Sequence, residues 1–381
     1  MMTREPGIRQ LRRWAIAGSL AELDTLRRAL GALGFVQADP IRSPARAQDL
    51  ILRHRVADYR AGDLERAFAR LRLEEDFLYA YGFMPSATKQ LLHPRLDPQA
   101  ADGRHAPHGL AADVLAYVRE HGATHPRDLE AQFGRERAVN GWGSLSKATT
   151  RALQRLHFYG LLRVARRQDG IRIYEAAAAP EDALAPDARA RRLALMVTRI
   201  LMPVPQASLR ATLAMMARHA PGLGRMDHAL RDLLASGELE SHEIAGETYV
   251  MPAGIRTKEP AASEREVRFL APFDPIVWDR RRFEQLWGWA YRFEAYTPPR
   301  KRQLGYYAMP LLFGDDVIGW ANVAMSDGDL QVDPGFVRGR PKGRDFRRAF
   351  DAEVARMEAF LAPRLRRAGA PGVPLVGAPT R

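Results

Sequence analysis

One order of helices and strands occurs twice along this chain, and that repeat constrains the fold more than any other feature. Between residues 110 and 175, three amphipathic helical stretches precede two β-rich runs joined by the turn "QDG". A similar series, different in its letters, runs from residue 188 to residue 252. Three helices followed by a hairpin is the order of the winged helix, a variant of the helix-turn-helix motif. The sequence therefore predicts tandem winged-helix domains.

The segment before the repeat has a less regular pattern, and it could be a third copy. Residues 8–31 are predicted to form one amphipathic helix, followed by helices over 43–54 and 63–75, the last capped by Asp63. Proline, glycine and histidine then gather at 93–109, which is typical of a linker.

The segment after the repeat indicates strands. From residue 264, aromatic and β-branched runs alternate with proline and Gly-Asp turns, which is typical of an antiparallel sheet or small barrel, and a helix closes it. The predicted fold class is α+β, with tandem winged-helix domains followed by a C-terminal antiparallel β-rich domain. The predicted divisions are an N-terminal winged-helix-like domain at 1–105, winged helices at 106–182 and 183–258, the β-rich domain at 259–368 and a disordered tail at 369–381.

The amino-acid composition shows that the chain is strongly basic, and it excludes several kinds of functional site. Lys and Arg number 58 against 45 Asp and Glu, a formal net charge of +13. Such an excess favours phosphate-rich partners, and an arginine bias of the whole genome is the alternative explanation. The chain has no cysteine, which excludes disulfides, thiolate nucleophiles and cysteine-ligated metals and fits a reducing cytoplasm. No membrane span and no signal peptide are expected.

The loop "GFVQADPI" at 34–41 holds the most informative polar pair. In an extended segment, side chains two positions apart emerge on the same side. Pro40 disfavours helical geometry at Asp39 and pushes that residue toward an extended backbone. The sequence therefore predicts that the Gln37 amide and the Asp39 carboxylate face one space. A plain turn is the alternative, because Asp before Pro commonly starts one.

This loop, the tandem winged-helix pattern and the block "LAPFDPIVWDRRR…YRFEAYTPPRKRQLGYYAMPLLFGD" at 270–315 together resemble one family across nearly the whole chain. It is the family of winged-helix DNA glycosylases that contains the azinomycin-resistance protein AlkZ and YcaQ-like relatives. Gln37, Ala38 and Asp39 match the Gln-x-Asp form of its catalytic motif, typical of the YcaQ-like branch. The chain differs from that branch at Ala38 and in "EEDFLYAYGFMP" at 74–85, which lacks an expected histidine and tryptophan.

The resemblance implies a monofunctional DNA glycosylase that removes N7-alkylguanines and unhooks interstrand crosslinks made through N7. A cationic base is already a good leaving group, so a single carboxylate suffices to stabilise the oxocarbenium-like sugar and activate water. We assign that role to Asp39, and the positioning of the water to Gln37. The alternative is a non-enzymatic winged-helix DNA-binding protein or regulator, which charge and architecture fit as well.

Basic side chains are predicted to contact DNA in three places. One group follows the catalytic motif, one lies on the third helix of the first repeat, where a winged helix reads DNA, and one lies on its hairpin. These residues are Arg42, Arg46, Arg53, Lys147, Arg151, Arg155, Arg163 and Arg166. A solvated basic face or packing between domains would explain them equally well.

No cofactor and no metal are expected. His105, His108, His121 and His125 are close in sequence, but without cysteine and in a proline-broken segment they do not make a convincing zinc site. The expected partner is double-stranded DNA with alkylated bases, and the expected state is a cytoplasmic, nucleoid-associated monomer.

Overall fold

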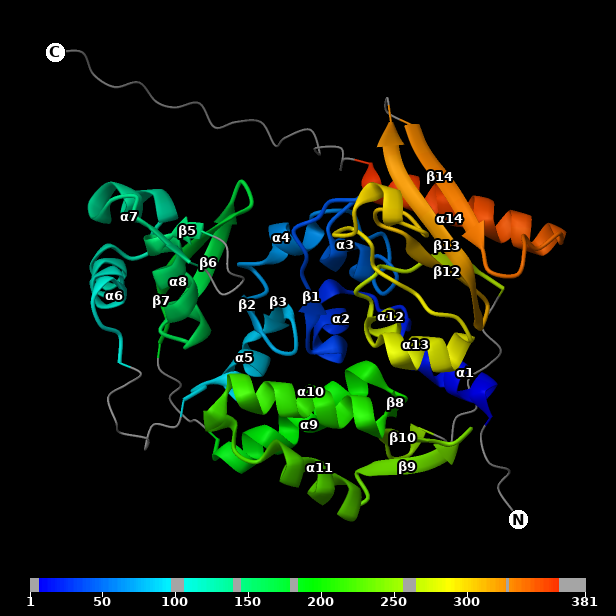
Figure 1. Cartoon of the computed structure of the whole chain (residues 1–381), viewed down its shortest axis with the longest axis horizontal. Helices are drawn as coiled ribbons and strands as arrows, with labels where there is room; N and C mark the ends of the chain where they lie inside the picture. The colour runs from blue at the N-terminus through cyan, green and yellow to red at the C-terminus, as the bar shows by residue number, and fades with distance from the viewer. Residues whose placement is uncertain are drawn as a thin grey trace, which may run out of the picture.

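The structure, a computed structural model, describes residues 7–96, 106–139, 145–178, 184–255, 265–326 and 329–362. The chain has an α+β fold in which the N-terminal elements lie in the middle (Figure 1). Two helix–hairpin groups, both green, lie to one side of these elements and below them, and the C-terminal sheet with its long helix lies on the other side. The predicted α+β class is confirmed. The predicted tail at 369–381 is outside the described residues.

The N-terminal part holds a small antiparallel sheet of order β1-β3-β2 among short helices. The pairing places Val36 of β1 opposite Phe83 of β3, and Leu73 of β2 opposite Pro85. The elements are α1 (Ile8–Ser19), α2 (Leu26–Leu33), β1 (Val36–Gln37), α3 (Ala47–Leu52), α4 (Asp63–Ala67), β2 (Leu73–Phe77), β3 (Tyr81–Pro85) and α5 (Ser86–Leu92).

The single helix predicted over residues 8–31 is wrong. The chain leaves the helical conformation after Ser19 and enters it again at Leu26. Between them, the Leu23 backbone N–H donates to the Arg55 carbonyl oxygen at 2.9 Å, and a threonine side chain caps the start of α2. A long-range backbone bond and a local cap therefore interrupt a pattern that is helical by its apolar spacing alone.

The two other helices predicted in this part are shorter than expected. α3 covers only the middle of 43–54, and α4 only the start of 63–75. Gly62 occupies the N-cap of α4, so Asp63 is the first helical residue, and its carboxylate accepts the Arg60 N–H. The end of the 63–75 segment forms β2, where its acidic side chains pair with arginines from a distant part of the chain.

The first helix–hairpin group has its own apolar core, with Val114, Leu129 and Leu156 among its buried side chains. Asp169 and Gly170 have φ of 51° and 81° at the hairpin tip, a two-residue turn of the kind that "QDG" predicts. A strand pair that the sequence did not predict precedes its third helix. The elements are α6 (Leu110–His121), α7 (Pro126–Phe133), β4 (Arg137–Val139), β5 (Leu145–Lys147), α8 (Ala148–Phe158), β6 (Leu162–Gln168) and β7 (Ile171–Ala176).

The second helix–hairpin group repeats this order but shares its core with the N-terminal part. Leu193 and Val197 of its first helix belong to the same cluster of buried side chains as Phe35 and Leu92. The elements are α9 (Pro186–Leu201), β8 (Val204–Pro205), α10 (Gln206–His219), η1 (Pro221–Leu223), α11 (Met226–Ala235), β9 (Leu239–Ile244) and β10 (Glu247–Pro252).

The C-terminal part is an antiparallel sheet of order β11-β12-β13-β14, and Phe346, Phe350 and Met357 of its long last helix are buried. Phe269 and Met309 of this sheet belong to the same buried cluster as Val36 of β1. The two ends of the chain therefore share one core. The elements are β11 (Val267–Phe269), α12 (Pro275–Trp278), α13 (Arg280–Trp287), η3 (Pro299–Lys301), β12 (Met309–Phe313), β13 (Asp316–Ser326), β14 (Asp329–Phe336) and α14 (Arg344–Leu361).

Within the described part of the chain, no helix combines the length and the apolar character that crossing a membrane requires.

Candidate active site and nucleic-acid interface

The loop that carries Gln37 and Asp39 begins as an edge strand. Gly34 ends α2 with φ of 66°, and β1 then pairs with β3. The pairing extends one residue past the strand, because the Ala38 N–H donates to the Tyr81 carbonyl oxygen at 2.9 Å. Val36 is buried and Ala38 packs against the same apolar cluster. Since side chains alternate along an extended backbone, this arrangement favours a common direction for Gln37 and Asp39.

The Asp39 carboxylate is half-buried and held by a local turn. Its Oδ1 accepts the backbone N–H of Ile41 at 2.9 Å, which is the turn that Asp before Pro predicts. Burial raises the pKa of the Asp39 carboxyl above its ordinary value, and the Ile41 hydrogen bond partly opposes that rise. The turn fixes the carboxylate in place and leaves its second oxygen for other chemistry.

The Gln37 side chain carries an acceptor without a partner. Its Oε1 is buried and accepts no hydrogen bond from any residue that the structure describes. A buried acceptor left unpaired costs about 1–3 kcal/mol, so such groups are usually satisfied by water, an ion or a ligand. The amide is therefore suited to hold a water molecule or a substrate group beside Asp39.

Two tyrosines of the C-terminal part lie within electrostatic reach of Asp39. Burial and then the negative charge of Asp39 raise the pKa of Tyr296 and of Tyr307. Tyr307 is buried, and its hydroxyl has no hydrogen-bond partner among the described residues. Sequence reasoning missed both residues, although they stand in the C-terminal block that carries the family resemblance. Only their tertiary position shows that they border this site.

A basic cleft of about 490 Å³ begins just past the Gln37–Asp39 pair. It lies between the segment after Asp39 and the β6–β7 hairpin, and Arg42, Arg46 and Arg166 line it. Arg42 and Arg166 are exposed, whereas Arg46 forms an ion pair with Glu65. The hairpin tip comes so close that a Cβ at Gly170 would lie 3.0 Å from Nη2 of Arg46. The structure thus brings together three of the basic residues predicted to contact DNA.

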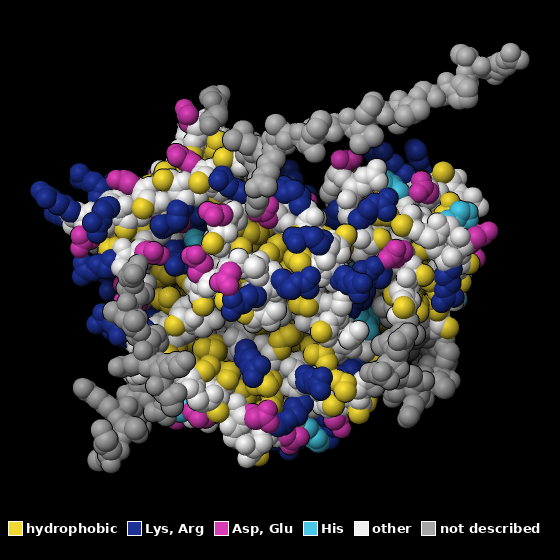
Figure 2. Space-filling view, turned by 180° about the vertical axis from the view of Figure 1, so that it is seen from behind, with side chains coloured by type: hydrophobic (Ala, Val, Ile, Leu, Met, Phe, Trp, Pro, Cys, Tyr) yellow, Lys and Arg dark blue, Asp and Glu magenta, His cyan; other side chains and the backbone are white. Residues whose placement is uncertain are grey.

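A second cleft, of about 900 Å³, shares Arg42 and Arg46 with the first and extends to Met325 and Asp329 at the tip of the β13–β14 hairpin. On the face shown in Figure 2, Lys and Arg side chains are spread among apolar and acidic ones. Surface charge on that face therefore does not mark one binding site by itself.

Two other predicted contacts are engaged inside the protein. Arg53 forms an ion pair with Glu353, and the Arg53 side chain is only 3% exposed. Arg163 binds Glu74, with Nη2 2.8 Å from a carboxylate oxygen, and also pairs with Glu175. Arg53 and Arg163 are therefore not among the phosphate contacts that we propose.

Of the predicted contacts in this region, Arg151 and Arg155 lie on the exposed side of α8, and Lys147 is the last residue of β5, just before that helix. Lys147 is half-exposed and pairs with Glu130 at 2.6 Å. Arg151 and Arg155 are exposed, and the Arg155 guanidinium lies 5.9 Å from the centre of the Tyr159 ring. These three residues do not line the cleft that contains Arg42 and Arg166. Their contact with DNA stays a prediction.

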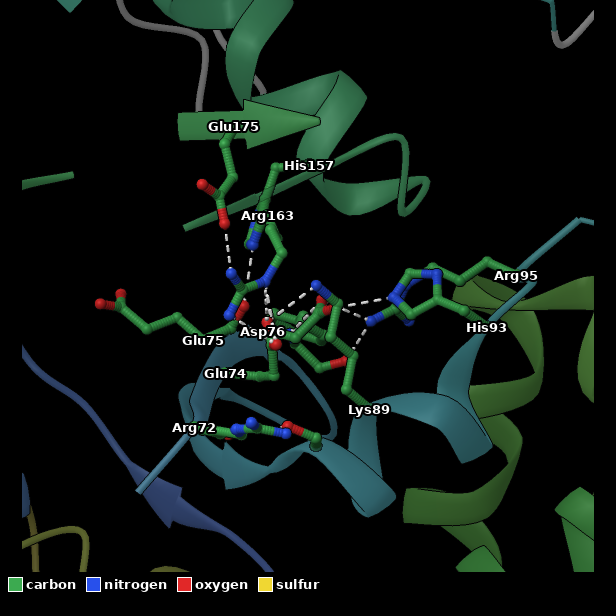
Figure 3. Close-up of polar contacts among 12 residues, drawn as sticks. Arg72, Glu74, Glu75, Asp76, Lys89, His93, Arg95, His157, Arg163 and Glu175 are labelled. Carbon is green, nitrogen blue, oxygen red and sulfur yellow. Dashed lines mark hydrogen bonds and ion pairs between the residues drawn. The ribbon is translucent and has the colours of Figure 1, made fainter. Parts of the chain in front are cut away.

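Two of the three consecutive acidic residues of β2, Glu74 and Glu75, join the N-terminal part to the first helix–hairpin group (Figure 3). The Glu74 carboxylate binds Lys89 at 3.0 Å as well as Arg163. The Glu75 carboxylate, fully buried, binds Arg167 at 2.6 Å and Arg172 at 3.3 Å. This is the segment in which the family pattern led us to expect a histidine and a tryptophan.

Asp76 completes this acidic strand with a separate set of partners. Its carboxylate binds His93 at 2.7 Å and Arg95 at 2.8 Å, both buried. Burial opposes ionisation, but the His93 hydrogen bond and the Arg95 charge outweigh it and hold the pKa of Asp76 below its ordinary value. On the facing helix, burial lowers the pKa of His157 to about 4, and its ring nitrogen bonds to the Glu75 carbonyl oxygen. The strand thus ties the β6–β7 hairpin to the N-terminal part.

The histidines weighed as metal ligands have other roles where they are described. His125 caps the start of α7, and the Nδ1 of His121 lies 2.9 Å from the Tyr117 carbonyl oxygen. His105 lies outside the described residues. Among the residues that are described, no three His, Asp or Glu side chains gather as a metal site would require.

Comparison with known proteins agrees with this arrangement. The family described as DNA glycosylase AlkZ-like matches residues 30–360, which include Gln37, Asp39, the cleft arginines and the two tyrosines. Among solved structures, the chain is similar to Streptomyces sahachiroi DNA glycosylase AlkZ, with a TM-score of 0.62 and 17% sequence identity over 93% of this chain and 97% of that one. At this identity the structural likeness shows a shared fold.

Proposed function

This chain belongs to the AlkZ-like family of DNA glycosylases and is a DNA glycosylase, and on that premise we propose that it hydrolyses the N-glycosidic bond of cationic N7-alkylguanines with Asp39 and Gln37. The observation that carries the proposal is the pairing of a held, half-buried carboxylate with a buried amide oxygen that lacks a partner. Family membership also argues against the alternative of a non-enzymatic regulator.

The reaction needs one carboxylate, because the positive charge of the alkylated base already makes it a good leaving group. As the bond from C1′ to N9 breaks, the sugar gains oxocarbenium character, which the Asp39 charge stabilises. A water molecule held by the Gln37 amide adds its oxygen to C1′ and gives one proton to Asp39. The products are an abasic sugar and a neutral N7-alkylguanine.

The proposed substrate is a DNA duplex that lies along the basic cleft. We propose that the two helix–hairpin groups are winged helices, and that Arg42, Arg46 and Arg166 neutralise phosphates next to the lesion. A guanine tied to the opposite strand cannot be flipped into a closed pocket. The exposure of Arg42 and Arg166 supports a cleft open to solvent, which would also accept such a crosslink.

The same proposal covers the oligomeric state, the cofactors and the location of the enzyme in the cell. The enzyme would act as a monomer on the duplex, without cofactor or metal, in the cytoplasm and in association with the nucleoid. The domain divisions predicted at 1–105, 106–182, 183–258 and 259–368 stay predictions. The core shared by the two ends of the chain favours a single unit made from the first and last of them.

A glycosylase assay tests the catalytic proposal. Duplex DNA with a single N7-methylguanine is incubated with the protein and then heated in alkali, which cuts the strand at abasic sites. Asp39→Asn should bind this DNA as the parent does while its rate falls by roughly 10² to 10⁴. Asp58→Asn is a matched control, because Asp58 is exposed and its φ of 52° suits Asn. Equal rates for Asp39→Asn and the parent would show that Asp39 has been misassigned.

A further inference from the structure

The loop at 294–307, here called the tyrosine loop, carries two exposed aromatic rings and adjoins Phe293, which packs on the same apolar cluster as Ala38, the residue before Asp39. The side chains of Tyr296 and Tyr306 are 76% and 43% exposed, and Tyr296 is the most exposed large apolar side chain in the described part of the chain. Exposed aromatic rings are unfavourable in water and often mark a surface that a ligand covers. Because Phe293 and Ala38 share this cluster and the Asp39 charge reaches Tyr296, the DNA substrate is the ligand best placed to cover the rings.

The tyrosine loop is fixed from inside. The buried Glu294 carboxylate accepts the backbone N–H groups of Gln303 and Leu304 at 2.8 Å each, and that of Gly305 at 3.3 Å. The Asn322 side chain donates to the Leu304 carbonyl oxygen at 2.8 Å. A buried carboxylate that ties one end of a loop to the other holds the rings in place before any ligand binds, which lowers the entropy cost of binding.

The two exposed rings differ in what they can still contact. The Arg302 guanidinium lies 5.0 Å from the centre of the Tyr306 ring and so covers one of its faces. Tyr296 meets Phe293 edge to face, with ring centres 6.0 Å apart and an angle of 74°. Tyr296 is 76% exposed, so most of its ring stays available for stacking.

The same loop carries basic residues. Arg300 and Lys301 are exposed and stand between the two tyrosines in sequence. An exposed aromatic ring interleaved with cations is the arrangement by which proteins hold an unstacked base and its phosphates. Because the face of a tyrosine ring carries negative electrostatic potential, it attracts a cationic base more than a neutral one.

We propose that the tyrosine loop holds the damaged nucleotide over Asp39, with the Tyr296 ring stacked on the cationic base and Arg300 and Lys301 on its flanking phosphates. This inference rests on the proposed function and assigns the recognition of the positive charge of the substrate to Tyr296. Asp39 then acts on the sugar while Tyr296 acts on the base. Tyr296 is thus a specificity-determining residue for the reaction.

Binding to a substrate analogue that resists hydrolysis tests this role. The probe is a duplex with 2′-fluoro-N7-methylguanosine, and the reference duplex carries 2′-fluoroguanosine at the same place. The measured quantity is the ratio of the two dissociation constants by fluorescence anisotropy. The parent should prefer the cationic duplex, and Tyr296→Leu should reduce that preference about 3- to 30-fold, the range expected for one cation–π contact. Tyr296→Phe keeps the ring and should keep the preference.

The control is Tyr117→Leu, which removes a partly exposed tyrosine ring from α6, in the first helix–hairpin group. It should bind both duplexes as the parent does. A parent without preference, or a Tyr296→Leu variant that keeps the parent's ratio, overturns the inference. Failure of the proposed function looks different, because the parent would then leave N7-methylguanine intact in the cleavage assay whatever residue stands at 296. The exposure of Tyr296 also means that its replacement leaves the fold intact, which a thermal melt verifies.

Discussion

At the scale of single residues, the site depends on groups whose surroundings set their chemistry. Asp39 is held by the Ile41 N–H in a half-buried position, and Gln37 offers a buried oxygen that has no partner among the described residues. Asp49 shows that a pKa raised by burial does not by itself identify a catalytic carboxylate. Burial raises the pKa of Asp49 to about 6, but its carboxylate accepts the Tyr59 hydroxyl in the core. Asp39 differs in that it stands three residues before Arg42 of the basic cleft and its charge reaches Tyr296 of the tyrosine loop.

The pKa of Asp39 leads to a prediction for the pH dependence of excision. Asp39 acts as a carboxylate, and burial raises its pKa above the ordinary value, so protonation on acidification begins at a higher pH than for an exposed Asp. The excision rate should therefore be constant near neutral pH and fall as the pH drops through this raised pKa.

Single-turnover rates on N7-methylguanine between pH 4 and pH 8 measure this dependence, with spontaneous depurination subtracted. The residual activity of Asp39→Asn should lack the acid limb. A parent rate that stays constant down to pH 4 would contradict the assignment of Asp39 as the base.

At the scale of secondary-structure elements, β2 is the clearest departure from local pattern. Its sequence continues a helical spacing, yet it pairs with β3 and directs Glu74 and Glu75 toward the arginines of the β6–β7 hairpin. Arg163, which the sequence predicted as a DNA contact, serves this junction instead, while its exposed neighbour Arg166 lines the cleft. These two arginines lie three positions apart on β6, with a register shift between Val164 and Arg166, and they serve two different purposes.

This junction yields a prediction for stability. Glu75 is fully buried between Arg167 and Arg172, so Glu75→Gln leaves two arginines without their counter-charge. Removing one partner of a buried ion pair typically costs about 3–5 kcal/mol, and we expect a loss of about 3 kcal/mol in the free energy of unfolding. Urea unfolding of the full chain measures it.

Glu175→Gln is the matched control for Glu75→Gln. Glu175 also pairs with an arginine, but its side chain is 33% exposed, so its replacement should cost less than about 1 kcal/mol. Equal losses for the two variants would contradict the view that the buried strand, rather than the hairpin surface, holds the first helix–hairpin group in place.

At the scale of the whole molecule, the loop that carries Gln37 and Asp39 lies where three parts of the chain meet. The β6–β7 hairpin closes one side of the basic cleft, and the tyrosine loop of the C-terminal part borders Asp39. A core common to the N-terminal part and the C-terminal sheet holds the segments that carry Asp39 and Tyr296 in a fixed relative position. The first helix–hairpin group has its own core and is joined to β2 by ion pairs. Its β6–β7 hairpin contributes arginines to the basic cleft.

The cleft leads to a prediction for DNA binding. Affinity should fall steeply with salt, because each neutralised phosphate releases condensed counterions. Arg166→Ala should weaken binding to any duplex sequence and reduce the slope of log K against log salt by about one. Anisotropy titrations between 50 and 200 mM salt, roughly the range over which such slopes are determined, measure the change.

Arg231→Ala is the control for the cleft prediction. Arg231 is an exposed arginine of α11, on the second helix–hairpin group, and its loss changes the net charge by the same amount. It should leave the slope unchanged. If both variants reduce the slope equally, the overall charge and not the cleft governs DNA binding.

The sequence by itself determined the elements whose signals are local. The helix–hairpin repeat, the "QDG" turn and the turn at Asp39 follow from short patterns of apolar spacing, glycine and proline, and they are present in the structure. Family membership also followed from local motifs, since short catalytic and structural stretches are enough to identify it.

The tertiary structure alone decided which side chains share a space. The break between α1 and α2, the change from helix to strand at β2 and the nearness of Tyr296 to Asp39 all depend on residues far away in the chain. The same is true of Arg53, which is buried against Glu353 of the last helix although its sequence context suggests a phosphate contact. Burial and ion pairing between residues distant in the chain outweigh a local helix propensity of a few tenths of a kcal/mol per residue. A local sequence pattern contains no information about these long-range contacts.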